Sequence, residues 1–463
     1  MGNINNSTAI DHIHIYHRLG VRPPHNTTRV LQLFGLQLPL SRWSWRIHGR
    51  ILPLLHLFDG NRHKDRPPPD VFVNLRVLWC KLLTSLDPNS LAYEGQQRRR
   101  KRGHSNNSNA VADTANQQEQ QQLFATYRML PPYSMKWTLR YLGLWRFFPR
   151  WMHANIELRT VYLNRALTKV LKLNMPSAEN NATSTISGIA ENVDKCAVDK
   201  GAVDTDNICV IILGGGYDPR GAKLSCCSPT TSNIRRVYEL DLPVVVDSKR
   251  RLLRRAGFRV IDDDDNKDIV DSGFDRDRDR DRDNGVRLEG IDLNDDVAVD
   301  QVLDKIQQEL ISLSKLSEDN NSDDSNSKNC SSTTRRNRWR VVVISEAVLM
   351  YLKPGKADRI LEGLSERFGE DGPNNFYNAS ASFVFADRLF RHNATANITS
   401  SENSVHDAST AADTAAKNVA TAEGFTGMEE SDVRQWLRDR GWKLQEFLSK
   451  PGATRHLGIA TTT

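Results

Sequence analysis

Three glycines end an apolar run at residues 210–216, where the sequence reads VIILGGG and continues as YDPR. An unbroken run of branched aliphatic residues predicts a strand that is buried on both faces. Glycines directly after it can adopt positive φ angles, and they let the backbone come close to a bound molecule. A strand that ends in such a turn is typical of sites for nucleotide-like ligands. Gly214 and Gly216 are therefore the first candidates for ligand-binding residues.

The spacing of these glycines argues against a dinucleotide or a phosphate group as the ligand. A dinucleotide-binding loop needs a third glycine three residues beyond the second, and Pro219 occupies that position. No Gly-Lys-Ser/Thr sequence follows, so the loop is not a phosphate-binding loop of the Walker type. The glycines have to serve a different nucleoside.

Acidic residues end three later apolar runs. Asp241 closes VYELD, 25 residues beyond Gly216, and Asp292 with Leu293 follows VRLEG. Glu346 closes RVVVISE. Parallel strands bring their carboxyl ends to one edge of a sheet, where an acid after the second strand can accept hydrogen bonds from ribose hydroxyls. An aspartate followed by an apolar residue suits an adenine, so the set predicts a cationic nucleoside without phosphates.

Each acid also has a purely structural interpretation. Asp292 could cap a helix that begins near Asp295, and Glu346 could cap the helix that follows it. Asp241 could simply begin a turn before Leu-Pro. What favours a site is that all three follow strands of one sheet.

The elements that must position these residues alternate between strands and helices. Apolar runs predict strands at 209–213, 237–241, 258–262, 286–292, 340–346, 382–388 and 442–448, the last of them taken as the final strand. Periods of three to four residues predict helices at 157–173, 242–257, 295–316, 356–369 and 429–441. This pattern predicts an α/β fold, Rossmann-like, with a mostly parallel twisted sheet and helices on both faces.

Composition limits how much of the chain belongs to that fold. Of 463 residues only 38% are hydrophobic, and polar low-complexity tracts interrupt the periodic segments. We expect disordered insertions at about 176–206, 263–285, 315–338 and 391–422. Residues 1–122 are expected to form an N-terminal extension, largely low-complexity or a possible targeting segment, and residues 123–460 the single globular domain.

Charge and cysteine usage exclude several classes of partner. The net charge is +6, and no aromatic residues interleave with the basic clusters, so we expect no nucleic-acid partner. The six cysteines form no Cys-x-x-Cys pair, which predicts no metal site and a reducing compartment. Charges interrupt the apolar N-terminal stretch, so we expect no membrane span. We expect a cytoplasmic monomer; the alternative is an organelle, because Asp11 is the one acid before residue 59.

The motifs together resemble the leucine carboxyl methyltransferase family, whose members use S-adenosyl-L-methionine. LGGGYDPRGAKL is similar to the family's glycine loop, and VYELDLPVVVDSKRRLL is similar to its second-strand motif. GIDLND, SEAVLMYL and ELRTVYLNRAL resemble its other blocks, in the family's order from about residue 123 to 460. The resemblance implies the class I methyltransferase form of the predicted fold.

The resemblance also implies a role for each candidate residue. Arg159 would hold the methionine carboxylate of the cofactor, and Glu346 would lie near its amino group. Gly214 and Gly216 would let the backbone pass close to it, and Asp241 would bind the ribose. Asp292 and Leu293 would contact the adenine.

The chain departs from the family at two places. The family's upstream lysine falls in QQQLFATYRMLPPYSMKW, where a glutamine replaces it, and Pro219 and Gly221 stand where the helix after the glycine loop should begin. The implied reaction is methyl transfer to a carboxylate, with the C-terminal leucine of a type 2A protein phosphatase catalytic subunit as one acceptor. A small-molecule carboxylate is the alternative acceptor, and a catalytically silent scaffold is the alternative function. Since a carboxylate is already ionised at pH 7, no general base is needed, and no catalytic residue is assigned.

Overall fold

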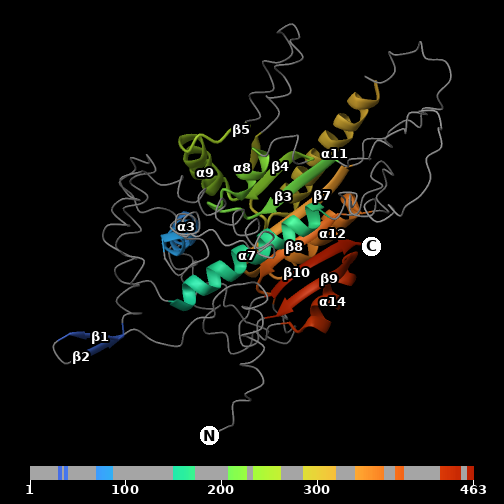
Figure 1. Cartoon of the computed structure of the whole chain (residues 1–463). Coiled ribbons are helices and arrows are strands. Elements are labelled where there is room, and N and C mark those ends of the chain that lie inside the picture. The colour runs from blue at the N-terminus through green and yellow to red at the C-terminus, as the bar shows by residue number, and fades with distance from the viewer. Residues whose placement is uncertain are drawn as a thin grey trace, which may run out of the picture.

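The structure is a computed structural model of the chain (Figure 1). It describes residues 30–33, 36–39, 69–86, 150–172, 207–226, 233–261, 285–319, 339–369, 381–389, 428–449 and 456–463. A short antiparallel hairpin near the N-terminus joins β1 (Val30–Leu33) to β2 (Leu36–Pro39). All other described strands belong to one sheet.

That sheet has eight strands in the order β5-β6-β4-β3-β7-β8-β10-β9. The strands are β3 (Asn207–Leu213), β4 (Ile234–Asp241), β5 (Val260–Ile261), β6 (Val286–Gly290), β7 (Trp339–Glu346), β8 (Ser382–Asp387), β9 (Trp442–Ser449) and β10 (His456–Thr462). Neighbours from β5 through β8 pair in parallel, and β10 pairs antiparallel with both β8 and β9. The prediction of an α/β fold with a mostly parallel sheet is confirmed.

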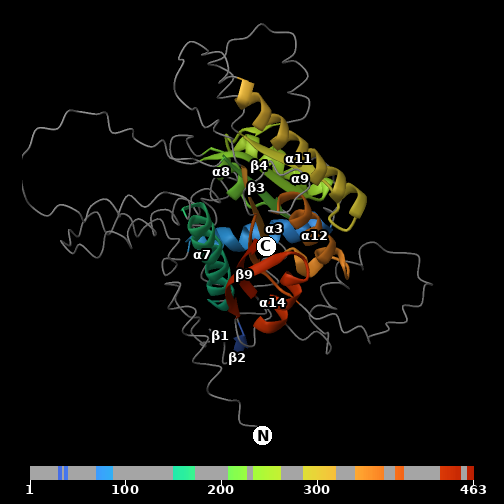
Figure 2. The same ribbon diagram turned by 90° about the vertical axis from the view of Figure 1, so that its right-hand side faces the viewer.

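Helices cover both faces of the sheet, with α7 on one side and α12 and α14 on the other (Figure 2). The helices are α3 (Pro69–Leu86), α7 (Arg150–Lys172), α8 (Arg220–Ser225), α9 (Pro243–Arg255), α11 (Asp296–Asp319), α12 (Lys356–Phe368) and α14 (Glu430–Arg438), with a 3-10 turn η4 (Leu349–Tyr351). One apolar core joins α3, α7 and α9 to the sheet, and a second joins α11, α12 and α14. Residues of β3 alternate between the two cores, so both of its faces are buried and the strand is a continuous apolar run.

The strand β10 was missed, because 442–448 was taken as the final strand. Its sequence, HLGIATT, has a glycine at its third position, which weakens a strand pattern. In the structure Gly458 lies opposite Phe385 of β8, and a Cβ on this glycine would meet the Phe385 ring at 2.2 Å. The glycine therefore makes room for a neighbouring aromatic ring, a reason that the sequence does not display.

The helix α3 lies within the 1–122 segment that was treated as an extension. Leu78, Trp79, Leu82 and Leu83 are buried in the same core as α7 and α9. The folded unit therefore includes residues upstream of the predicted boundary at 122/123, and the remaining boundaries stay predictions. The predicted insertions lie outside the described residues, apart from residue 285 and the end of α11 at 315–319.

Within the described part of the chain, no helix combines the length and the apolar character that crossing a membrane requires. The apolar N-terminal stretch considered above lies outside the described residues, apart from the β1–β2 hairpin.

Candidate active site

The candidate site lies at the carboxyl edge of the sheet, where the strand order reverses. The first strand of this sheet along the chain, β3, lies between β4 and β7, and both pair with it in parallel. The chain leaves β3 into the glycine loop, and Glu346 ends β7. Connections that depart in opposite directions from such a point leave a crevice between them, which is where α/β folds bind ligands.

The glycine loop (residues 214–216) can only be made of glycine. Gly214 and Gly216 have φ angles of 55° and 47°. A Cβ on Gly214 would meet Val348 at 2.3 Å, and one on Gly216 would meet Asn74 at 2.5 Å. The loop is therefore held close to η4 on one side and to α3 on the other.

The structure explains the two departures after the loop. Pro219 precedes the first residue of α8, with a φ of −80°, and proline tolerates this position because no helical hydrogen bond needs its missing N–H. Gly221 lies in the first turn of α8, and a Cβ there would meet Oε1 of Glu239 at 2.1 Å. A helix does begin where the resemblance requires one, and Gly221 lets it approach β4.

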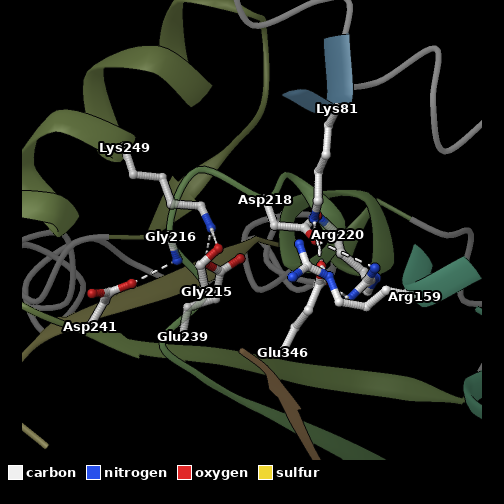
Figure 3. A network of polar contacts seen from close by, with 10 residues as sticks. All are labelled: Lys81, Arg159, Gly215, Gly216, Asp218, Arg220, Glu239, Asp241, Lys249 and Glu346. Carbon is white, nitrogen blue, oxygen red and sulfur yellow. Dashed lines mark hydrogen bonds and ion pairs between the residues drawn. The ribbon is translucent and has the colours of Figure 1, made fainter. Parts of the chain in front are cut away.

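Five charged side chains gather beyond the loop, around Glu346 (Figure 3). Lys81 Nζ lies 2.8 Å from Asp218 Oδ2 and 3.1 Å from Glu346 Oε1. Arg159 Nε lies 2.7 Å from Glu346 Oε1, and Arg220 Nη1 lies 3.1 Å from Glu346 Oε2. We call these five residues the Glu346 cluster. It joins α3, α7, the loop after β3, the start of α8 and the end of β7.

The Glu346 cluster is buried and contains three cations and two carboxylates. Side-chain exposure is 2% for Lys81, 7% for Arg159 and 4% for Arg220, against 10% for each of the two carboxylates. Burial alone would raise the pKa of Glu346, but the three cations together lower it below its usual value. Glu346 is therefore ionised, and it is the carboxylate that all three cations of the cluster share.

Sequence reasoning assigned no site role to three members of this cluster: Lys81, Asp218 and Arg220. The family's upstream lysine was sought in residues 120–137, which lie outside the described residues. Lys81 reaches the cluster instead from the last turns of α3, between the buried residues Cys80 and Leu82. A lysine inside an otherwise apolar helical stretch, LWCKLL, was the available signal, since lysine is rarely buried without a partner.

Asp241, the last residue of β4, is hydrogen-bonded to the glycine loop. Gly216 donates its backbone N–H to Oδ2 of Asp241 at 2.6 Å, and Leu242 donates to Oδ1 at 2.8 Å. The second contact fits the alternative interpretation of Asp241 as a turn starter, and its ribose-binding role stays a prediction.

Asp292 and Leu293 follow β6, beside Asp241. The backbone N–H of Ile291 donates to the Asp241 carbonyl at 2.7 Å, which fixes the two strand ends together. Asp292 is exposed, and its Oδ1 accepts the backbone N–H of Asn294 at 2.9 Å, while Leu293 is buried in the core shared with α11. The cap of α11 is Asp295, whose Oδ1 accepts the N–H of the helix's second residue at 3.1 Å. The capping interpretation of Asp292 is therefore wrong.

Glu346 does not cap the turn that follows it either. Asp387, at the end of β8, accepts the N–H groups of Val348 and Leu349 at 2.8 and 2.9 Å and the hydroxyl of Ser345 at 2.9 Å. Between these residues Ala347 has a φ of 58°, a strained angle for alanine. Burial raises the pKa of Asp387, although these hydrogen bonds oppose the shift. Asp387, which sequence reasoning also missed, thus holds the turn that carries Glu346.

Among the described residues, no group of three or more His, Cys, Asp or Glu side chains is arranged to hold a metal ion. The histidine whose side chain is described, His456, is buried at the start of β10, opposite Asp387 of β8. Its Nδ1 accepts the N–H of Leu389 at 3.1 Å, and its Nε2 donates to the carbonyl of Met428 at 2.7 Å. Burial lowers the pKa of His456, and the Met428 carbonyl opposes this shift.

Comparison with known protein families identifies one match. Residues 189–309 match the family model described as leucine carboxyl methyltransferase. This match confirms, over these residues, the resemblance inferred from the motifs. The matched range contains the glycine loop, Asp241, Asp292 and Leu293, while Arg159 and Glu346 lie outside it. A search of curated protein sequences finds no match.

Solved structures with weak similarity are all distant in sequence. They include an O-methyltransferase family protein from Burkholderia thailandensis, 10% identical over 67% of this chain and 60% of the other, with a TM-score of 0.27. Magnesium protoporphyrin IX methyltransferase from Synechocystis PCC 6803 is 11% identical over 56% and 75%, with a TM-score of 0.25. The pyocyanin biosynthetic protein PhzM is 12% identical over 57% and 52%, with a TM-score of 0.24. This chain spans about half the length of the first structures that it matches, PhzM among them.

Proposed function

We propose that this chain, which matches the leucine carboxyl methyltransferase family over residues 189–309, transfers a methyl group from S-adenosylmethionine to a carboxylate. The acceptor that we propose is the C-terminal leucine of a type 2A protein phosphatase catalytic subunit. The observation that carries the proposal is the buried Glu346 cluster, which places three cations beside the glycine loop.

The residues present fit the cofactor that the family implies. The glycine loop excludes every side chain, which suits close contact between backbone and ligand. Among the described residues, the Nε of Arg159 forms an ion pair with Glu346. The two terminal nitrogens of the guanidinium suit a carboxylate. We assign the cofactor's carboxylate to Arg159 and Lys81, its amino group to Glu346 and its ribose to Asp241. The adenine is assigned to Asp292 and Leu293.

The charge of the cofactor favours an anionic acceptor. S-adenosylmethionine carries one net positive charge, from its sulfonium, and the three cations of the Glu346 cluster lie beside the glycine loop. Positive charge in a buried site attracts a carboxylate and disfavours an amine, since electrostatic forces are strong where water is excluded.

The proposed reaction requires the protein to bind the cofactor and the acceptor and to align them. When bound, S-adenosylmethionine supplies an electrophilic methyl group. A carboxylate acceptor is ionised at pH 7, so no side chain has to remove a proton. The protein has to place the acceptor oxygen in line with the methyl group and the sulfur, and to exclude water. A binding site of fixed geometry does both.

The proposal is tested with methyl-labelled S-adenosylmethionine and three phosphatase C-terminal peptides: the natural one, one without its last leucine, and one with a C-terminal amide. We expect label on the first peptide alone, released as methanol by mild base, as a carboxyl methyl ester requires. Arg159→Met should abolish transfer, while Lys169→Met, at an exposed ion pair on the same helix, should leave it unchanged.

The other outcomes refute defined parts of the proposal. Base-labile label on a small molecule, with none on any peptide, refutes the phosphatase and favours the small carboxylate. Base-stable label refutes a carboxylate acceptor. Failure to bind the cofactor refutes the methyltransferase assignment and favours a silent scaffold.

A further inference from the structure

A second charged pair lies beneath the glycine loop, separate from the Glu346 cluster (Figure 3). Glu239 of β4 and Lys249 of α9 are 1% and 3% exposed. Lys249 Nζ contacts Glu239 Oε2 directly. No role was assigned to either residue from the sequence, and neither is placed against the cofactor by the proposed function.

The carboxylate of Glu239 lies directly against the loop. A Cβ on Gly215 would come within 2.6 Å of its Oε2, and one on Gly221 within 2.1 Å of its Oε1. Burial raises the pKa of Glu239, and Lys249 opposes that shift. A buried ion pair is often no more stabilising than an apolar pair of the same volume, because both charges lose their hydration. Stability alone therefore does not account for a charged pair at this position.

The peptide group between Gly215 and Gly216 is held at both of its ends. Lys249 Nζ lies 3.4 Å from the carbonyl oxygen of Gly215. The N–H of Gly216, on the other side of the same peptide group, donates to Asp241 Oδ2 at 2.6 Å. A lysine from α9 and an aspartate from the end of β4 thus fix one peptide plane, next to a residue with a φ of 47°.

We propose that Lys249 and Glu239 form a positioning pair for the cofactor site. Lys249 fixes the orientation of the Gly215–Gly216 peptide group and, through the Gly216 N–H, the carboxylate of Asp241. Glu239 holds Lys249 in place by its ion pair. The inference rests on the proposed function for the identity of the ligand, and it adds a determinant of cofactor affinity that touches no cofactor atom.

The experiment compares three variants of the full chain, by thermal unfolding without ligand and by calorimetric titration with S-adenosylmethionine. Lys249→Met leaves a lone buried carboxylate, so it should lower both the melting temperature and the affinity. The double variant Glu239→Leu/Lys249→Met leaves no buried charge, so its melting temperature should return close to that of the wild type. Its affinity should stay about 10- to 100-fold weaker, because nothing then holds the Gly215 carbonyl.

A third variant, Glu239→Gln, removes the charge but keeps an oxygen to which Lys249 can donate, so the amine stays beside Gly215 and the affinity should stay within about threefold of the wild type. Turnover by the double variant at saturating cofactor should also stay within about threefold, because the pair acts on binding. Lys305→Met, at an exposed ion pair with Glu289, serves as the control and should change neither measurement.

Two results would overturn the inference: a double variant that regains both melting temperature and affinity, or a Glu239→Gln variant that loses as much affinity as Lys249→Met. If the double variant does not fold, the comparison of the two single variants decides. A wild-type chain that does not bind S-adenosylmethionine would refute the proposed function. Wild-type binding with unaffected variants would refute this inference alone.

Discussion

Replacing Lys81 by methionine tests whether α3 belongs to the active site. Methionine keeps much of the length and volume of lysine and removes its charge. Lys81 is 2% exposed and lies within 3.1 Å of both carboxylates of the Glu346 cluster. The substitution therefore removes one cation and leaves the packing of α3 nearly unchanged.

The expected loss of stability follows from the cations that remain. Breaking a buried ion pair costs about 3–5 kcal/mol when it leaves a charge uncompensated. Here Arg220 still lies 3.1 Å from Glu346 and 3.4 Å from Asp218, so neither carboxylate is left alone. We therefore expect a loss of about 2–3 kcal/mol. For a domain of this size that lowers the melting temperature by roughly 4–12 °C.

Cofactor affinity should fall as well, because Lys81 is one of two cations assigned to the cofactor's carboxylate. The loss of a charge-assisted hydrogen bond predicts binding that is weaker by about tenfold or more. Thermal unfolding and calorimetric titration with S-adenosylmethionine measure the two effects separately. Lys169→Met is the control: this lysine is 56% exposed in its pair with Glu446, and its loss should cost under about 1 kcal/mol. A Lys81→Met variant that behaves like this control would show that α3 contributes nothing to the site.

Two further predictions concern buried groups outside the Glu346 cluster. Asp387→Asn should lower the free energy of unfolding by about 1–3 kcal/mol and weaken cofactor binding, because the turn that carries Glu346 loses a carboxyl acceptor for its backbone N–H groups. Unchanged affinity would contradict the positioning role. His456→Gln should flatten the pH dependence of stability below pH 6.5. Burial lowers the pKa of His456, so the unfolded chain takes up a proton near pH 6.5 and the folded chain only at lower pH. The wild type should therefore lose stability as pH falls from 7 to 5, a loss the variant lacks. Urea unfolding across that range measures it, and parallel slopes in both proteins would refute the argument.

The sequence predicted the structure correctly wherever a structural requirement fixes the residue types of a short stretch of the chain. Strands buried on both faces have to be apolar throughout, so β3 and β7 could be located from composition alone. The acids that follow the strands could be located as well, because they interrupt apolar runs. Asp241 is one of them: it could be located from the sequence, while its hydrogen bond to Gly216 of the glycine loop is seen only in the structure.

Residues whose role depends on a distant partner were not recognisable in this way. Lys81 is 137 positions from Asp218 and 265 from Glu346 along the chain. Asp387 looks like the ordinary end of a strand until its contacts with the turn after β7 are seen. Gly458 weakens the pattern of β10, and only the ring of Phe385 explains it.

The glycine loop and its surroundings separate what the sequence determined from what the tertiary structure decided. The sequence by itself determined that a buried strand ends in glycines, that acids follow its neighbours, and that the ligand should be a phosphate-free cationic nucleoside. Only the tertiary structure showed the contact that requires Gly221, and the lysine that completes the Glu346 cluster. It also showed that Lys249 and Glu239 lie against the glycine loop. The physical reason is the sequence separation over which each interaction acts. Periodicity and backbone preference act over a few residues, whereas charge pairing and close packing act between whichever atoms the fold brings within a few ångströms.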